Sequence, residues 1–147
     1  MRKHIYNSLI AFFGGLFGVS VLFILLWLLV NAAHLELPVL TFYGFLLLYL
    51  GYSFIEEGTK FLLIKRDMGQ FPYGFLLGFG FGMGETILKY PFWEFGVVPT
   101  SRFGAILLHS FTAGIICYFV KKDRPVLGLA IAILAHTGFN LFIQFSI

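Results

Sequence analysis

Five long apolar stretches, separated by short segments that carry charged residues, dominate this sequence. They cover residues 5–30, 38–64, 73–88, 102–120 and 125–145. An apolar run of about 20 residues is long enough to cross the hydrocarbon core of a bilayer as a helix. Composition agrees, because 59% of the residues are hydrophobic and 12% are charged, against about 45–50% and about 25% in soluble domains. We therefore predict an all-α integral membrane protein, a single domain spanning residues 1–147 with about five transmembrane helices.

The basic residues indicate how these helices are oriented. One side of the predicted bundle receives seven of them: Arg2, Lys3, Lys65, Arg66, Lys121, Lys122 and Arg124. The segments on the other side contain Lys89 and Arg102. Because cytoplasmic loops are enriched in Lys and Arg, we expect the N-terminus in the cytoplasm and the C-terminus outside. So short a chain, with no soluble domain, indicates a multi-pass protein of a prokaryotic plasma membrane.

The second apolar stretch contains charged residues at a depth where charges are costly. Residues 53–60 read Ser-Phe-Ile-Glu-Glu-Gly-Thr-Lys, which places Glu56, Glu57 and Lys60 inside the stretch. Ionisable residues inside a membrane span are functional candidates by default. Lys60 lies i+4 and i+3 from the two glutamates, so it is within reach of both and would hold one of them ionised. The other could act as an acid or hydrogen-bond donor, and we favour Glu56 as the base.

Other polar residues fall at nearly the same depth. At about 1.5 Å per helical residue, Glu57 lies roughly 12 Å from the cytoplasmic end of its stretch. Glu85, His109 and His136 come out at roughly 16–18 Å on the third, fourth and fifth stretches. Asn140 is one turn beyond His136 on the same helix face. Four helices are therefore predicted to contribute polar groups to one layer.

The polar residues also exclude several classes of protease. Both aspartates, Asp67 and Asp123, fall in loops, whereas an aspartyl intramembrane protease needs two in the membrane. The sequence contains no HExxH zinc motif. Ser110 directly follows His109, and neighbours at i and i+1 on a helix point apart, which argues against a serine protease.

Small residues recur at helical spacing in two of the stretches. Gly14 and Gly18 form a small-xxx-small pair in the first stretch, and Gly74, Gly78 and Gly82 repeat every four residues in the third. In lipid, such patterns allow helix backbones to approach closely. These faces are compatible with a homodimer or with packing inside the chain.

The polar motifs, taken in order, resemble those of the PrsW family of glutamic intramembrane proteases. That family is related to the CAAX prenyl proteases, the bacteriocin-processing enzymes and the non-catalytic scaffold subunit of gamma-secretase. The resemblance covers about residues 45–142 and rests on Glu56-Glu57-x-x-Lys60, Phe81-x-x-x-Glu85 in a Gly-Phe-Gly-rich helix, His109 with a downstream glycine, and His136-x-x-x-Asn140. The CAAX branch has EExxxR and a histidine where this chain has EExxK and Glu85, so both differences favour the PrsW branch.

The resemblance implies a separate catalytic role for each group of residues in the site. A glutamate of the pair, Glu56 or Glu57, would activate water together with His109. His136 with Asn140 would stabilise the oxyanion. Peptide hydrolysis without a metal or a protein nucleophile does require a carboxylate base and donors directed at the developing oxyanion.

Structural alternatives exist for the acidic residues. Glu56, Glu57 and Lys60 could form an intrahelical ion cluster with no catalytic role. Glu85 could cap a helix, or pair with Lys89 four residues later.

Three functions therefore remain open. The first is an intramembrane endopeptidase that acts on a membrane-anchored protein substrate in the lipid bilayer. The second is a metal-dependent hydrolase or transporter that uses the histidines and glutamates. The third is a non-catalytic scaffold, in which His109, His136 and Asn140 would be interhelical hydrogen-bonding residues. We favour the first, with no cofactor, no metal and no nucleic-acid partner.

Overall fold

A computed structural model of the protein describes residues 2–33, 42–64, 70–89 and 100–146. Within these residues the chain forms five helices and no strands, so the all-α prediction is confirmed for them. The helices are α1 Arg2–Ala33, α2 Phe42–Leu63, α3 Phe71–Lys89, α4 Thr100–Lys121 and α5 Pro125–Ser146. Each coincides with one predicted apolar stretch, with ends that differ by a few residues. The predicted start of the second helix at Pro38 lies outside the described residues.

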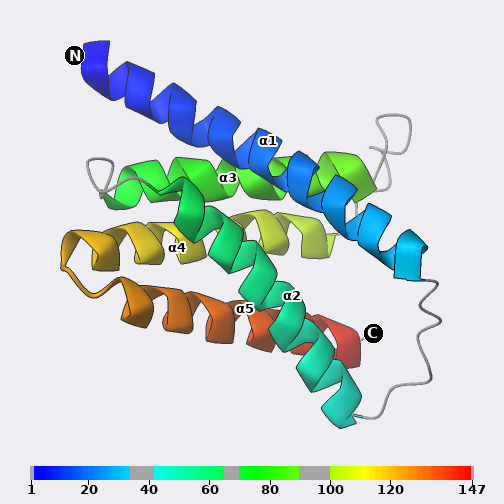
Figure 1. Ribbon diagram of the computed structural model, residues 1–147. Helices are drawn as coiled ribbons and strands as arrows, with labels where there is room; N and C mark the ends of the chain where they lie inside the picture. Colours follow the sequence, from blue (N-terminus) through cyan, green and yellow to red (C-terminus); the bar gives the residue numbers. More distant parts are fainter. Residues whose placement is uncertain (1, 34–41, 65–69, 90–99, 147) are drawn as a thin grey trace.

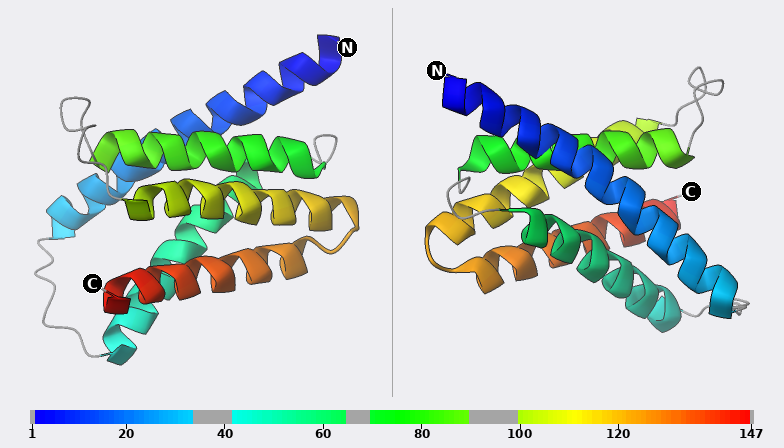
Figure 2. Two further views of the ribbon diagram at one scale, coloured as in Figure 1. Left: turned by 180° about the vertical axis from the view of Figure 1, so that it is seen from behind. Right: turned by 45° about the horizontal axis from the view of Figure 1, so that its top comes forward.

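The helices form two layers. Seen from behind, α3, α4 and α5 lie side by side, and α1 and α2 cross them on the other side (Figure 2). α3 packs against α1 and α4, α5 packs against α4 and α2, and α2 crosses the other helices obliquely (Figure 1). α2 makes a larger contact with α5 than with α4.

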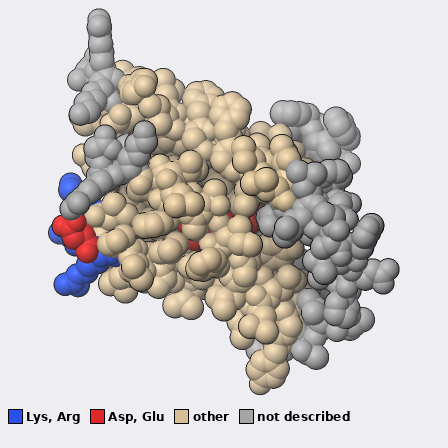
Figure 3. Space-filling view, viewed as in Figure 1, with Lys and Arg blue, Asp and Glu red and all other residues tan. Residues whose placement is uncertain are grey.

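A short turn joins α4 to α5, and the two helices run antiparallel side by side (Figure 1). Asp123 in this turn has a φ of 55°, a left-handed conformation that aspartate tolerates better than most residues. Its neighbours Lys121, Lys122 and Arg124 are exposed and form a charged patch at one end of the bundle (Figure 3).

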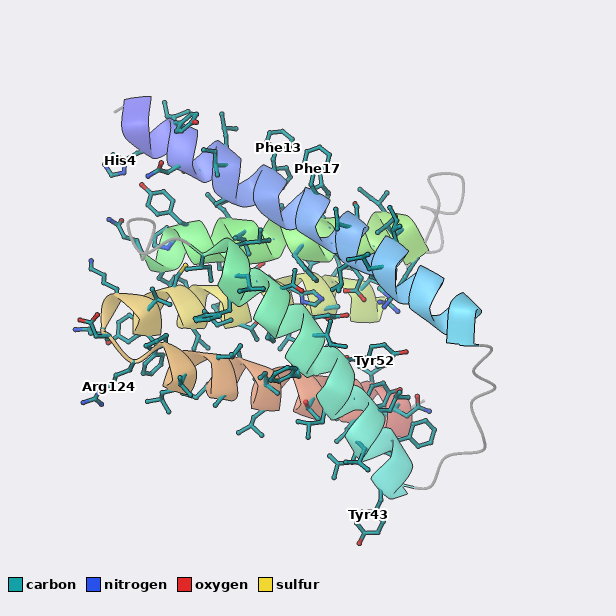
Figure 4. All side chains as sticks on the ribbon, in the orientation of Figure 1. His4, Phe13, Phe17, Tyr43, Tyr52 and Arg124 are labelled. Atoms are coloured by element: carbon teal, nitrogen blue, oxygen red, sulfur yellow. The ribbon has the colours of Figure 1, made fainter. Side chains whose placement is uncertain are left out.

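Three of the described helices are long and apolar enough to cross a membrane, within residues 4–25, 102–121 and 125–146. α2 is less apolar because it carries Glu56, Glu57 and Lys60, and α3 is rich in glycine. Large apolar side chains cover the outside of the molecule; Phe13 and Phe17, for example, point away from the bundle (Figure 4). Such a surface is typical of a protein that is embedded in lipid.

The glycines of α3 allow two neighbouring helices to approach its backbone. A Cβ atom on Gly78 would overlap the carbonyl oxygen of His109 in α4, and one on Gly80 would overlap that of Phe12 in α1. The predicted small-residue contacts of α3 are therefore made inside the chain. In α1 the contact residue is Gly15, which meets the carbonyl of Leu77, whereas nothing lies within 4 Å of a Cβ atom on Gly14. Gly14 therefore makes no close helix contact inside the chain, whereas a Cβ atom on Gly18 would meet the side chain of Leu63 in α2.

Gly78→Ala should lower the stability of the protein by about 1–3 kcal/mol, because the added methyl group forces α3 and α4 apart. The unfolding of purified protein in detergent would measure the change. Gly14→Ala is the matched control: it adds the same group to a helical glycine with open space around it, and should change the stability by less than about 0.5 kcal/mol. Equal effects of the two substitutions would contradict this account of the packing.

Candidate functional site

A cavity of about 600 Å³ opens between the two layers, and all five helices contribute to its lining. It lies in the half of the bundle where α3 ends and α4 begins. Its walls include aromatic side chains such as Phe23, Phe139 and Tyr52, the last labelled in Figure 4. The ionisable and amide side chains that line it include Glu56, Glu85, Lys89, Arg102, His109, His136 and Asn140. In Figure 3 some red atoms of acidic residues are visible among the tan atoms of this face. The cavity therefore combines mostly apolar walls with a group of ionisable side chains.

Lys60 lies behind this cavity and is fully buried. Its ammonium donates hydrogen bonds to Glu57 Oε1 at 2.5 Å and to His109 Nδ1 at 2.8 Å, with a longer bond to Thr112 Oγ1 at 3.3 Å. An ammonium has three donors, so these partners use all of them. The ring of Phe81 lies below the charge, 4.9 Å from Nζ to the centroid. Lys60 thus joins α2 to α4 through a fully satisfied buried cation.

The bond from Lys60 fixes the tautomer of His109. Because an ammonium can only donate, Nδ1 of His109 must accept, and the ring proton of the neutral imidazole is on Nε2. Nε2 then donates to Glu85 Oε2 at 2.6 Å. Both ring nitrogens of His109 are engaged, so this histidine accepts no further proton without losing a partner.

His136 lies between the two adjacent glutamates of α2. Its Nδ1 is 2.8 Å from Glu57 Oε1, and its Nε2 is 3.4 Å from Glu56 Oε2. A carboxylate oxygen accepts only, so Nδ1 donates to Glu57. Nε2 then either donates to ionised Glu56, with His136 as an imidazolium, or accepts from protonated Glu56, with His136 neutral. Glu57 is fully buried, whereas Glu56 lines the cavity. Adjacent residues on one helix therefore have different environments.

Glu85 connects His109 to two cations. Its Oε1 accepts from Lys89, four residues later on α3, and lies 3.5 Å from Nη1 of Arg102 on α4. Its other oxygen accepts from His109. The pairing of Glu85 with Lys89, one of the alternatives left open by the sequence, is present, and it exists together with the contact to the histidine.

The structure differs from the sequence-based expectation in how the histidines are paired. His109, which was expected to activate water together with Glu56 or Glu57, has Lys60 and Glu85 as hydrogen-bond partners, and a nitrogen of its ring lies within 4.8 Å of a Glu56 oxygen. His136 was expected to act with Asn140, and it contacts both glutamates of α2. Both α4 and α5 contact the acidic segment of α2, since Thr112 of α4 and His136 of α5 each bind Glu57. Asn140 lines the cavity one turn beyond His136.

Two parts of the site were not found from the sequence. Thr112 is buried and donates to Glu57 Oε1 at 3.2 Å; its position three residues after His109, on the same face of an apolar helix, was the available signal. Arg102 was considered for topology alone, and nothing in the sequence shows that it lines the cavity.

A ligating atom from each of Glu56, His109 and His136 lies within 4.8 Å of the others, close enough to surround one metal ion. Glu57 on Nδ1 of His136 would be a suitable outer partner for such a ligand. His109 is less suitable, because its two nitrogens already bind Lys60 and Glu85.

The described residues form a helical protein with three helices apolar enough to cross a membrane and with a cavity that several ionisable side chains line. No protein-family model, no curated protein and no solved structure matches this chain. The functional argument therefore rests on the residues of the site.

Proposed function

We propose that the protein is an intramembrane endopeptidase that hydrolyses a peptide bond of a membrane-anchored protein, with Glu56 as the base that activates water. The observation that carries the proposal is the difference between the two adjacent glutamates. Glu56 lines the cavity near Nε2 of His136, while Glu57 is buried and accepts a hydrogen bond from Nδ1 of the same imidazole. A carboxylate next to a positioned imidazole inside a cavity has the geometry of a general acid–base pair.

In the proposed reaction, water attacks the carbonyl carbon as Glu56 takes its proton. The oxygen of the tetrahedral intermediate becomes negative, and we assign the side-chain amide of Asn140, which lines the cavity, as a donor to it. The C–N bond then breaks, and the proton held between Glu56 and His136 passes to the leaving amine. Glu57 keeps Nδ1 of His136 protonated, so that Nε2 is the nitrogen that exchanges protons with Glu56.

We further propose that the protein crosses the membrane five times and that it is related to the PrsW family. The charged turn at residues 121–124 and the start of α1 lie at the same end of the bundle (Figure 1), which supports five spans with that end in the cytoplasm. The cavity then lies nearer to the non-cytoplasmic side of a prokaryotic plasma membrane.

Co-expression with a panel of single-span membrane proteins tests the proposal. Proteomics should detect new fragments in cells that make the wild-type protein and none in cells that make Glu56→Gln at the same level. Identical fragments in both would exclude Glu56 as the base. No fragments in either, together with co-purification of one intact panel member, would favour the scaffold function.

The cluster of Glu56, His109 and His136 favours a metal-dependent hydrolase as the second candidate. We expect the purified protein to hold less than one equivalent of zinc or iron and to keep its activity in a chelator, because a metal on His109 would have to displace Glu85 or lie beside the Lys60 ammonium. Elemental analysis and cleavage assays would measure both, with zinc-saturated chelator as the control. Loss of activity that added Zn²⁺ restores would establish the metal mechanism instead.

A further inference from the structure

A second cavity, of about 440 Å³, lies at the end of the bundle that carries the charged patch. It is formed where α3 begins and α4 ends, and its lining consists of Gln70, Phe71, Pro72, Tyr118, Lys121 and Lys122. Figure 3 shows the basic side chains grouped at this end of the molecule. Residues 102–121 are apolar enough to cross a membrane, so the end of that segment and the cavity beside it would lie where the bilayer meets water.

Positive charge predominates around this cavity. Residues 121–124 contain three cations and one carboxylate, that of Asp123, which can neutralise one of the three at most. The segment before α3 does not reverse the balance, because residues 65–70 contain two basic residues and one acidic residue. Two of the cations, Lys121 and Lys122, line the cavity, and Nζ of Lys122 lies 5.8 Å from the ring centroid of Tyr118. The cavity therefore suits an anion.

The end of α4 does not need the lysine side chains as caps. The carbonyl groups of residues 118–120 accept hydrogen bonds from the backbone N–H groups of residues 122–124. The orphan carbonyls that a basic side chain often satisfies at a helix C-terminus are thus already paired. Both ammonium groups keep their donors for another partner.

An aromatic, partly exposed face continues from the cavity along α3 and α4. Phe71, at the cavity, is in ring contact with Phe75 one turn further along α3 and with Phe111 of α4. Phe111 lies two turns before Tyr118, about 10 Å deeper along α4. Both Phe111 and Tyr118 are about half exposed. Cations, an interfacial tyrosine and then an apolar face follow one another in the order of the phosphate, the interfacial region and the acyl chains of a phospholipid.

We propose that this cavity binds the phosphate of an anionic phospholipid, with Lys121 and Lys122 as the cations and with the acyl chains along Phe71 and Phe111. A lipid is the anion that presents both a phosphate and an apolar chain at this boundary. A headgroup with a net negative charge is preferred to a zwitterionic one because the cavity carries surplus positive charge. With the topology proposed above, the lipid belongs to the cytoplasmic leaflet. The site is separate from the larger cavity and does not depend on the proposed hydrolysis.

Native mass spectrometry of the protein released from neutral detergent counts bound lipids and gives apparent dissociation constants. The probes are phosphatidylglycerol, phosphatidylcholine with the same acyl chains, and glycerol 3-phosphate, which has a phosphate but no acyl chain. We expect one phosphatidylglycerol per chain to bind at least about tenfold more tightly than phosphatidylcholine, as charge-assisted contacts allow. An equal concentration of glycerol 3-phosphate should not displace it.

Variants locate the binding at the cavity. Lys121→Gln and Lys122→Gln should each weaken the binding of phosphatidylglycerol about fivefold, and Lys122→Arg should retain it. Arg124→Gln is the matched control: it removes the same charge from an exposed neighbour outside the cavity lining (Figure 4). At physiological salt it should change the dissociation constant by less than about twofold. All three positions are exposed, so the variants should fold.

Equal binding of the two lipids would overturn the proposal, because the headgroup charge would then not be recognised. Equal losses in Arg124→Gln and Lys122→Gln would also overturn it, since the turn would then attract lipid through its overall charge without a site at the cavity. Displacement of the lipid by glycerol 3-phosphate would assign the cavity to a soluble phosphate ester instead. These measurements use no cleavage assay, so the lipid site and the proposed hydrolase can fail independently of each other.

Discussion

Glu56→Gln should reduce the rate of substrate cleavage by about 10²- to 10⁴-fold, the usual contribution of a general base. The substitution keeps the size of the side chain and removes its ability to take a proton. The folded state should be little affected, because the closest described contact of the carboxylate is 3.4 Å from His136 and the side chain lines the cavity. The expected signature is a large loss of kcat with an unchanged melting temperature.

The adjacent residue offers a matched comparison. Glu57→Gln removes a charge from a fully buried pair with Lys60, so it should lower the melting temperature markedly. Single-turnover cleavage of a purified substrate identified in the co-expression panel, together with thermal unfolding, would separate the two variants. If Glu57→Gln left stability intact and removed activity, while Glu56→Gln remained active, the roles assigned to the two glutamates would have to be exchanged.

Lys60→Met should destabilise the protein by about 3–5 kcal/mol, the typical cost of removing one partner from a buried ion pair. Methionine fills a similar volume but cannot donate to Glu57, His109 or Thr112. The Glu57 carboxylate would then be left in the interior without a counter-charge. Equilibrium unfolding in mixed detergent micelles would give the change in free energy.

The double variant Lys60→Met/Glu57→Gln tests the reason for this loss. It removes both charges, so its destabilisation should be smaller than the sum of the two single effects, with a coupling of about 0.5–3 kcal/mol. Lys121→Met, at an exposed position, should change the stability by no more than about 0.5 kcal/mol. Simple additivity of the two buried substitutions would show that Lys60 and Glu57 do not depend on each other.

The parts of the site that lie along one helix followed from the sequence. Lys60 contacts Glu57 at i+3, and Lys89 contacts Glu85 at i+4, because the geometry of a helix fixes these spacings in advance. The rise per residue also placed Glu85, His109 and His136 at similar depth, and the structure gathers them around one cavity.

The contacts between residues of different helices could not be predicted from the sequence. Which glutamate contacts which histidine is set by the rotation of each helix about its axis and by the tilt of α2, and neither is encoded in spacing within a segment. The hydrogen-bond partners of His109 and His136 could not be predicted for this reason. For the same reason Arg102 gave no sign that it lines the cavity, since its contact with Glu85 joins two helices.

The close backbone contacts of α3 determine which helices are open to redesign. Gly15, Gly78 and Gly80 bring α1, α3 and α4 together so tightly that no side-chain substitution at these positions fits without moving a backbone. His109 and Glu85 are held by that three-helix unit. Engineering of a new substrate preference should therefore begin with cavity-lining residues of α2 and α5 that take no part in the contacts of Gly15, Gly78 and Gly80, such as Tyr52 and Ile143.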